Sequence, residues 1–379
     1  MWLIGARGSV ATTAIVGLLA LREGVIAPTG CVTELPDLRS APLPGWDEIV
    51  VGGHDISATG LPKAAEHLVS AGLLPARVIG AVGGGLGAVE DELRTGYATG
   101  DPGTQAAAVE RLSGDIEDFA QRNRLRRVVV VNLASTERPW PDRPEHHDPG
   151  ALDAALSSGD PVLPPSGVAA RAAIRAGCPY VEFTPSMGID HPALRELADR
   201  AGVPYAGRDG KTGETLLRTA LAPVFIERGL NVRSWAGTNL LGGGDGATLA
   251  DPETAASKLE SKSRGLAALL GGEVEAPLHI DHVADLGQTK VAWDHVRAEG
   301  FLGAPVTLQL SWSGYDSALA APLVLDLVRL MALAHHAGRR GPLVDLACFF
   351  KDPFGEVEHR FDHQVRRLHA WVRAIEEER

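Results

Sequence analysis

The start of the chain constrains the fold most strongly, because a short apolar segment is followed directly by glycines and then by an apolar, helix-like run. Residues 2–4 precede the turn Gly-Ala-Arg-Gly-Ser-Val-Ala at 5–11, and the apolar run continues to residue 21. Glycines at such a turn let the backbone approach a pyrophosphate at a helix N-terminus. We therefore predict the first strand, turn and helix of a dinucleotide-binding fold, although the Gly-x-x-Gly-x-x-Ala spacing departs from the usual one.

Downstream of this start, apolar segments rich in β-branched residues alternate with helix-compatible stretches. The apolar segments lie at residues 31–35, 49–51, 127–131 and 180–183, and alanine-rich stretches such as 104–121 and 168–176 separate them. This alternation is typical of a parallel sheet covered by helices. We expect a surface loop at 139–149, a long apolar helix at 320–336, and an amphipathic packing helix at 361–379. The fold class predicted is α/β.

Length and composition restrict the class of protein. A chain of 379 residues has room for two domains, and its net charge of -12 argues against a nucleic-acid or anionic-membrane partner. Three widely separated cysteines without metal-ligand spacing are typical of a reducing cytoplasm. Glycines and hydroxyl residues interrupt the N-terminal apolar run, which favours a folded element over a signal peptide or membrane span. The sequence leaves open whether Met1 is the true start.

Lysine is rare in this chain and is concentrated in one region. Only six of the 36 basic residues are lysines, and five of the six lie between residues 211 and 351. An amine can lose its proton near neutral pH and act as a base or acid, which a guanidinium cannot. Lys258 and Lys262 stand four residues apart on a predicted helix that starts at Asp251, so they share one face. Their mutual repulsion would lower the pKa of at least one of the two amines, or both ammonium groups could bind one dianion. The competing interpretation is that the two lysines belong to a solvated charged face.

Two glycine-rich segments precede this predicted helix in the sequence. Residues 242–246 (Gly-Gly-Gly-Asp-Gly) could bind an anion through backbone N–H groups or hold sugar hydroxyls through the carboxylate. Residues 209–213 (Asp-Gly-Lys-Thr-Gly) combine a carboxylate, an amine and a hydroxyl within a flexible backbone. Both segments could equally be ordinary turns.

Taken in order, these motifs resemble those of the inositol-3-phosphate synthases. The segment 209–214 is similar to their Asp-x-Lys-Ser-Gly-Gln loop, 239–246 to their Asn-His-Leu-Gly-Asn-Asn-Asp-Gly motif, and 257–263 to their Ser-Lys-x-x-Ser-Lys-Ser helix. The resemblance continues at 287–290, 316–322 and 350–353, and in the nucleotide-binding part at 5–11, 53–56 and 135–138. Several matches in the same order are far more specific than one.

The resemblance implies an isomerase that uses NAD without net redox change. Bound NAD would oxidise C5 of an open-chain hexose 6-phosphate, the ketone would acidify C6, the C6 enolate would close the ring, and hydride would return. The resemblance implies an NAD-binding domain at 1–185 and 311–379 and an inserted α+β catalytic and oligomerisation domain at 186–310. It also implies tightly held NAD and a homotetramer, with a dimer as the smaller possibility.

Site residues follow from the resemblance by motif. Catalytic roles fall to Lys258, Lys262, Lys290, Lys351, Asp245 and Asp316, with Lys258 serving the C5 hydroxyl and Lys351 as a second proton donor. Phosphate contacts fall to Thr212, Gly213, Glu214, Lys262 and Lys290. Cofactor contacts fall to Gly5, Arg7, Gly8, Ser9, Val10, Asp55, Ile56, Ser135, Thr136, Asp209, Gly244 and Asp316. Asp209 is also the candidate ligand of a monovalent or divalent cation.

One of these assignments competes with a general rule. The carboxylate that binds the adenosine ribose usually follows the glycines by about 20 residues, which points nearer to Glu34. The family pattern favours Asp55 instead, and we prefer Asp55.

The chain also departs from the family pattern around the sugar. Glu214 replaces a glutamine, Gly243 and Gly244 replace paired asparagines, Leu240 replaces a histidine, and Gln288 replaces an aspartate, whereas the four signature lysines remain. The catalytic groups therefore look intact while the substrate contacts differ. Glucose 6-phosphate would give an inositol phosphate, and fructose 6-phosphate would give a five-membered cyclitol phosphate by the same steps. Outside the cyclases, an NAD-dependent sugar-phosphate dehydrogenase and a non-catalytic NAD-binding protein stay open.

Overall fold

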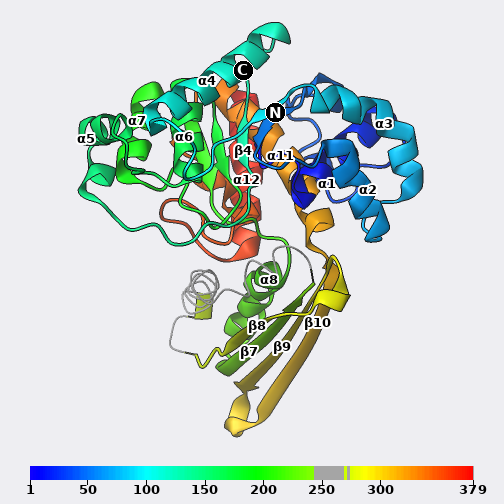
Figure 1. Cartoon of the computed structure of the whole chain (residues 1–379). Coiled ribbons are helices and arrows are strands. Elements are labelled where there is room, and N and C mark those ends of the chain that lie inside the picture. The colour runs from blue at the N-terminus through cyan, green and yellow to red at the C-terminus, as the bar shows by residue number, and fades with distance from the viewer. Residues whose placement is uncertain (243–268, 271–273, 379) are drawn as a thin grey trace.

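The chain forms a large parallel sheet surrounded by helices and a smaller second sheet below it (Figure 1). The computed structural model describes residues 1–242, 269–270 and 274–378. The large sheet has the order β11-β6-β5-β4-β1-β2-β3, and all its strand pairs are parallel. Its strands are β1 (Trp2–Ile4), β2 (Gly52–Asp55), β3 (Leu93–Thr95), β4 (Val130–Asn132), β5 (Tyr180–Glu182), β6 (Pro204–Gly207) and β11 (Gly341–Pro342).

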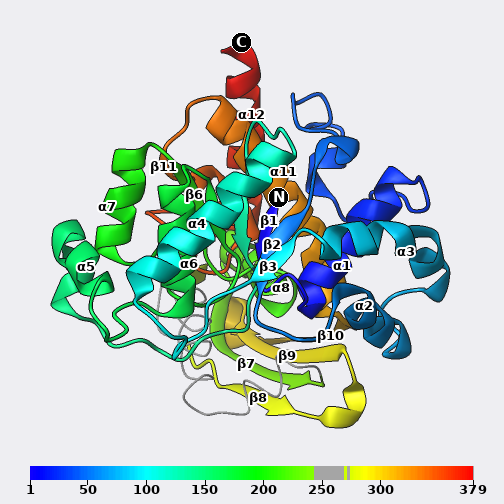
Figure 2. The same ribbon diagram turned by 45° about the horizontal axis from the view of Figure 1, so that its top comes forward.

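Helices cover both faces of the large sheet, as the alternation of apolar segments predicts. One group lies on each side in Figures 1 and 2. The first group comprises α1 (Ser9–Arg22), α2 (Leu61–Ser70), α3 (Ala76–Glu90) and α11 (Asp316–His336). The second comprises α4 (Gln105–Arg122), α5 (Pro149–Leu156), α6 (Pro165–Arg175) and α7 (Pro192–Ala201).

The strands supply both hydrophobic cores because successive side chains point to opposite faces. Leu3, Val131 and Val181 pack in the core that contains α1 and α11. Their chain neighbours Trp2 and Val130 pack in the core that contains α4 and α6. The central strands β1, β4 and β5 are therefore apolar on both faces, which is the expected composition of a parallel sheet buried on both sides.

Helix α11 crosses the middle of the molecule and packs against α1. By length and composition it is the one helix among the described residues that could span a membrane, but 67% of its most apolar window is buried inside the protein. The C-terminal helix α12 (Phe361–Glu377) packs on η6 (Val344–Phe349) and on α8 (Glu214–Glu227). Both α11 and α12 were expected from the sequence, at slightly different bounds.

The expected strand at residues 31–35 is wrong. This segment forms the short 3-10 helix η1 (Val32–Glu34). The carboxylate of Asp326 on α11 accepts hydrogen bonds from the N–H groups of Val32 and Thr33 and from the Thr33 hydroxyl. A side chain therefore satisfies the backbone groups that a neighbouring strand would otherwise bind. Further short 3-10 helices are η2 (Trp46–Glu48), η3 (Pro144–His147), η4 (Ala284–Leu286) and η5 (Phe301–Gly303).

The second sheet has the order β10-β9-β7-β8 and packs against α8. Its strands are β7 (Asn231–Leu241), β8 (Leu278–His282), β9 (Thr289–Glu299) and β10 (Pro305–Tyr315). Trp235 and Val296 pack on Phe225 of α8 in a small core of their own. The opposite face of β9 is more open, and Trp293 on it is 41% exposed.

The two sheets share the chain in a way that bears on the predicted domains. The large sheet takes strands from residues 2–207 and 341–342, and the second sheet takes strands from 231–315. The division at residues 186 and 310 remains a prediction, and these elements would place its first boundary after β6. Helix α11 begins at Asp316 directly after β10 ends at Tyr315, so this junction lies where the two sheets meet.

Candidate active site

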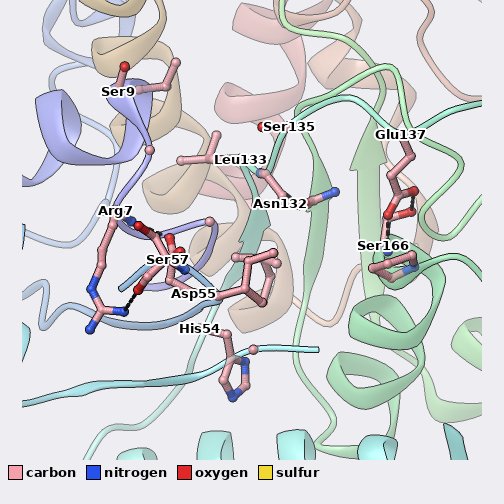
Figure 3. Close-up of a pocket in the computed structure, with 18 of the residues that line it drawn as sticks. Arg7, Ser9, His54, Asp55, Ser57, Asn132, Leu133, Ser135, Glu137 and Ser166 are labelled. Atoms are coloured by element: carbon pink, nitrogen blue, oxygen red, sulfur yellow. Dashed lines mark hydrogen bonds between the residues drawn. The ribbon is translucent and has the colours of Figure 1, made fainter. Parts of the chain in front are cut away.

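A cavity of about 680 Å³ opens at the carboxyl ends of β1, β2 and β4 (Figure 3). The strand order changes direction between β1 and β4, and ligands of open α/β sheets bind at such a point. One part of its lining comes from the first turn and the ends of β2 and β4. A second part comes from the segment after β3 and from α6, and a third comes from the second sheet and the start of α11, through Gly242, Gln288, Thr289, Lys290, Asp316 and Ser317.

The first turn allows a very close approach between two loops. Gly5 has a φ of +77°, and a Cβ at this position would lie 2.7 Å from the Cα of Ala134. Gly8 is the N-cap of α1, so the N-terminus of this helix faces the cavity together with Ser9 and Val10. The N–H groups of the first turn and the helix dipole make this end suitable for a pyrophosphate.

Asp55 is the last residue of β2 and lines the cavity. Its Oδ2 accepts a hydrogen bond from the Arg7 N–H at 2.7 Å, and its Oδ1 accepts one from the Ser57 N–H at 2.6 Å. Glu34, the candidate that the usual spacing favours, lies in η1 and pairs with Arg329 at 2.7 Å. The structure therefore brings Asp55 to the first turn and ties Glu34 to α11.

The loop after β4 contributes Ser135 to the lining next to Asn132, whereas Thr136 is not part of it. Glu137 also lines the cavity and accepts hydrogen bonds from the backbone N–H and the hydroxyl of Ser166. Burial raises the pKa of Glu137, and the bonds from Ser166 oppose that effect. Figure 3 shows this pair on the wall opposite Arg7 and Asp55.

A fully buried carboxyl group lies behind this wall. Glu182 accepts hydrogen bonds from the Asn132 amide, the Tyr180 hydroxyl and the hydroxyl and N–H of Thr184. Burial is the largest influence and raises the pKa of Glu182 to about 7. Sequence reasoning missed this residue, and its only signal was an acidic residue at the end of an apolar strand.

Three predicted residues come together on the side of the cavity that the second sheet and the start of α11 form. Lys290 and Asp316 both line the cavity, and the Lys290 Nζ lies 3.6 Å from the Asp316 Oδ2. The Thr212 hydroxyl donates to the Asp316 Oδ1 at 2.6 Å. The carboxylate of Asp316 thus orients an ammonium and a hydroxyl from two different segments.

A second pair joins two predicted residues from distant parts of the chain. The Lys351 Nζ donates to the Asp209 Oδ1 at 2.7 Å, and the Lys351 N–H donates to the Asp209 carbonyl. Neither residue is in the cavity lining. A cation at Asp209 would have to compete with this ammonium, and the described residues hold no group of three or more His, Cys, Asp or Glu side chains suited to a metal ion.

Glu214 lies away from the cavity lining, in a buried cluster between α8 and the second sheet. The Asn239 amide donates to its Oε2 at 2.6 Å, and the Arg218 guanidinium lies 2.5 Å from its Oε1. Arg218 also donates twice to Asp294. Arg218 therefore compensates the charge of Glu214, the residue that the resemblance assigns to the substrate phosphate.

Lys211 is a buried lysine for which the sequence suggested no separate role. Its Nζ donates to the Gln364 Oε1 of α12 at 2.7 Å. Burial is the main cause that lowers the pKa of Lys211 to about 8. Four further predicted site residues lie outside the described residues: Gly244, Asp245, Lys258 and Lys262.

The parallel sheet with its change of direction, the glycine turn before α1 and the carboxylate that ends β2 define a dinucleotide-binding protein of the Rossmann type. Comparison with known families goes further, because the family described as Myo-inositol-1-phosphate synthase, an NAD-binding family, matches residues 1–373. The chain belongs to this family of isomerases.

Individual relatives agree with this assignment. Inositol-3-phosphate synthase 1 of Bacteroides thetaiotaomicron is 34% identical over 392 residues, covering 96% of this chain and 91% of the relative. Inositol-3-phosphate synthase 1 of rice is 29% identical, covering 88% of this chain and 74% of the relative. The crystal structure of the Caenorhabditis elegans inositol-3-phosphate synthase has a TM-score of 0.87 at 21% identity, covering 99% of this chain and 85% of that one. This last likeness concerns the fold.

Proposed function

We propose that this protein converts glucose 6-phosphate into a myo-inositol phosphate, with NAD as a cofactor that is regenerated in each cycle. The observation that carries the proposal is a cavity lined by both the first turn and the pair Lys290 and Asp316. A dinucleotide and a sugar phosphate could therefore meet in one space. Membership of the family supports the same reaction class.

The residues around the first turn suit NAD. The absence of a Cβ at Gly5 leaves room for the contact between the two loops, the N-terminus of α1 offers N–H groups, and Asp55 offers acceptors for ribose hydroxyls. Bound there, NAD would supply a nicotinamide able to take up a hydride and return it. Asn132, Ser135 and Glu137 extend the lining on the opposite side.

The chain's own side chains would handle the protons and the developing negative charge. Lys290, oriented by Asp316, is suited to bind phosphate or stabilise the oxyanion of the C6 enolate. From the resemblance, Lys258 serves the C5 hydroxyl as base and later as acid, with Asp245 holding hydroxyls. Lys351, held by Asp209, would act as a second proton donor.

The phosphate group would bind at the loop before α8, through Thr212 and Gly213 together with Lys262 and Lys290. Thr212 lies against Asp316 and so against the cavity lining. The neighbouring Glu214 would not repel the phosphate strongly, because Arg218 and Asn239 bind and compensate its carboxylate. The departure from the family's glutamine is therefore compatible with a phosphorylated substrate.

We further propose that the protein is a homotetramer in the cytoplasm, with a dimer as the alternative assembly. Cys31, Cys178 and Cys348 are all free and buried, which fits a reducing compartment. The open face of the second sheet and the exposed tip between β9 and β10 are the surfaces that a second copy could cover. A cation at Asp209 stays a prediction, to be tested by activity after chelation and in sodium or potassium salts.

The proposal is tested by phosphorus and carbon NMR of the purified protein with NAD, given glucose 6-phosphate or fructose 6-phosphate without isomerase. We expect an inositol phosphate from glucose 6-phosphate and no lasting NADH absorbance. A cyclopentane product formed from fructose 6-phosphate alone would show that fructose 6-phosphate, and not glucose 6-phosphate, is the substrate. NADH formed in proportion to product would indicate a dehydrogenase, and no conversion with normal NAD binding would indicate a non-catalytic protein.

The role of Lys290 is tested with the variant Lys290→Met. Losing an ammonium that meets developing charge should lower kcat by roughly a hundredfold or more while NAD still binds. Lys63→Met is the control, because Lys63 is exposed and pairs with Glu66 one turn further along α2. Equal kcat values for the two variants would show that Lys290 has no catalytic role.

A further inference from the structure

Arg7 places a guanidinium beside the expected position of the adenosine ribose. Its backbone N–H donates to Asp55, and its Nη1 donates to the Ser57 carbonyl at 3.0 Å. Figure 3 shows the Arg7 side chain running along the same wall as Asp55 and Ser57. In Rossmann folds a carboxylate at the end of this strand binds the ribose 2′-hydroxyl, and a nearby arginine accommodates a 2′-phosphate. This chain has both groups at one position.

Glu90 holds the Arg7 guanidinium from the far side. The Arg7 Nη2 lies 2.5 Å from the Glu90 Oε1, and its Nε donates to the Oε2 at 3.4 Å. The Leu61 N–H at the start of α2 also donates to the Oε2, at 2.6 Å. Burial raises the pKa of Glu90, but the bonds from Arg7 and Leu61 outweigh it and hold the pKa below its usual value. Glu90 is therefore ionised at neutral pH.

The pair is partly shielded from solvent, with exposed side-chain fractions of 16% for Arg7 and 28% for Glu90. Screening by salt is weaker for such a pair than for one at the open surface. A 2′-phosphate at this site would meet the Asp55 carboxylate and an arginine whose charge is paired with Glu90 and whose Nε, Nη1 and Nη2 already donate to Glu90 or to the Ser57 carbonyl. A 2′-hydroxyl carries no charge and needs only an acceptor, which Asp55 provides.

We propose that Glu90 is a specificity-determining residue, which withholds Arg7 from the 2′-phosphate of NADP and so makes the site selective for NAD. This rests on the proposed function, because it presumes that the cavity binds NAD. Glu90 acts through Arg7 and is a positioning residue.

The test is isothermal titration of NAD⁺ and of NADP⁺ into the purified wild type and variants. In Glu90→Gln the amide oxygen can still accept from Leu61, but the charge that holds Arg7 is gone. We expect the affinity for NADP⁺ to rise by about tenfold or more, the gain expected from one charge-assisted hydrogen bond, with NAD⁺ affinity changed by less than about threefold. Adding Arg7→Gln to Glu90→Gln should return NADP⁺ affinity to the wild-type value.

Glu92→Gln is the matched control, because Glu92 lies just beyond α3, pairs with Arg122 at 2.9 Å and is absent from the cavity lining. It should change neither affinity. A Glu90→Gln variant that binds NAD⁺ normally without gaining affinity for NADP⁺ would overturn the inference alone. A wild type that binds no NAD⁺ would overturn the proposed function and the inference with it.

A second variant keeps the test valid if Glu90→Gln does not fold. In Arg7→Gln alone, NADP⁺ affinity should fall by less than about twofold, because Arg7 contributes little to an anion while Glu90 holds it. A tenfold loss would mean that Arg7 already serves the 2′-phosphate in the wild type. That result would contradict the inference.

Discussion

Glu182 is the residue whose burial has the clearest consequence for pH dependence. Its pKa is about 7 in the folded chain against an ordinary value of 4.5, so the folded state binds the proton more tightly than the unfolded state. This contribution to the free energy of unfolding is therefore fully present below about pH 4.5, declines as pH rises and is lost above about pH 7. Asn132 donates to this carboxyl group and also lines the cavity, so it links the titration of Glu182 to the cavity wall.

The variant Glu182→Gln removes this titration while keeping the shape of the side chain. We expect the wild type to lose roughly 1–3 kcal/mol of unfolding free energy across that pH range and the variant to lose much less. Urea denaturation at a series of pH values measures the difference. Glu110→Gln, at an exposed position on α4, is the control and should follow the wild type. Parallel curves for Glu182→Gln and the wild type would show that the carboxyl group does not titrate in this window.

At Gly5, the absence of a Cβ allows the close contact between the first turn and the loop after β4. Gly5→Ala would place a Cβ against Ala134 and force a positive φ on a residue that disfavours it. We expect a loss of about 1–3 kcal/mol in unfolding free energy and NAD affinity at least about tenfold weaker. Gly17→Ala in α1 is the control, since a Cβ there would meet nothing within 4 Å among the described residues, and it should gain up to about 1 kcal/mol. Differential scanning calorimetry and NAD titration measure both effects.

At the scale of elements, the sequence predicted helices and strands best where short, wholly buried strands alternate with alanine-rich helices. The strands near 130 and 180 and the helices near 104–121 and 168–176 lie within a few residues of their predicted places. The prediction of a strand at 31–35 failed because the apolar, β-branched composition of this segment was the only local signal. The carboxylate that holds it, Asp326, is 294 residues away from Val32 and becomes a neighbour only when α11 packs on α1.

Helix α8 and the second sheet meet around charges that must be balanced. Arg218 is 4% exposed and lies between Glu214 and Asp294, both of which are 2% exposed. Burial raises the pKa of Asp294, and Arg218 opposes this effect. The guanidinium thus compensates two carboxylates that are shielded from water.

Arg218→Met should therefore destabilise the protein by about 3–5 kcal/mol, because it leaves buried carboxylates without their cation. The loss should be smaller at low pH, where the carboxylates can take up protons. Thermal unfolding at two pH values measures both effects, with Arg228→Met at the exposed C-terminal end of the same helix as the control. A drop in stability no larger than that of the control would show that the carboxylates find new partners.

At the scale of the whole molecule, the tip between β9 and β10 is the most exposed apolar part of the described chain. Phe301 is 88% exposed and Leu302 is 90% exposed, both in η5. Adjacent large apolar side chains at such exposure are typical of a surface that another chain covers. A second copy of this chain is the occupant that our proposal of a tetramer requires.

The double variant Phe301→Asp with Leu302→Asp should shift the assembly toward smaller species in sedimentation velocity, because it places charge where apolar contacts are expected. The fold should persist, since both side chains project from a hairpin tip. Leu35→Asp is the control for one exposed apolar residue elsewhere, at 47% exposure. Unchanged sedimentation of the double variant would exclude the tip from the interface.

The sequence by itself determined the fold class, the family and the order of the motifs, because the glycine turn, the strand and helix alternation and the spaced lysines are local patterns. Tertiary structure alone decided which of those motifs touch. It paired Lys351 with Asp209 and Thr212 with Asp316, and it turned Glu214 toward Arg218. It also held Arg7 with Glu90, 83 residues away in the chain. Periodicity reports which face of an element is buried, but the partner of a charged side chain depends on how distant elements pack.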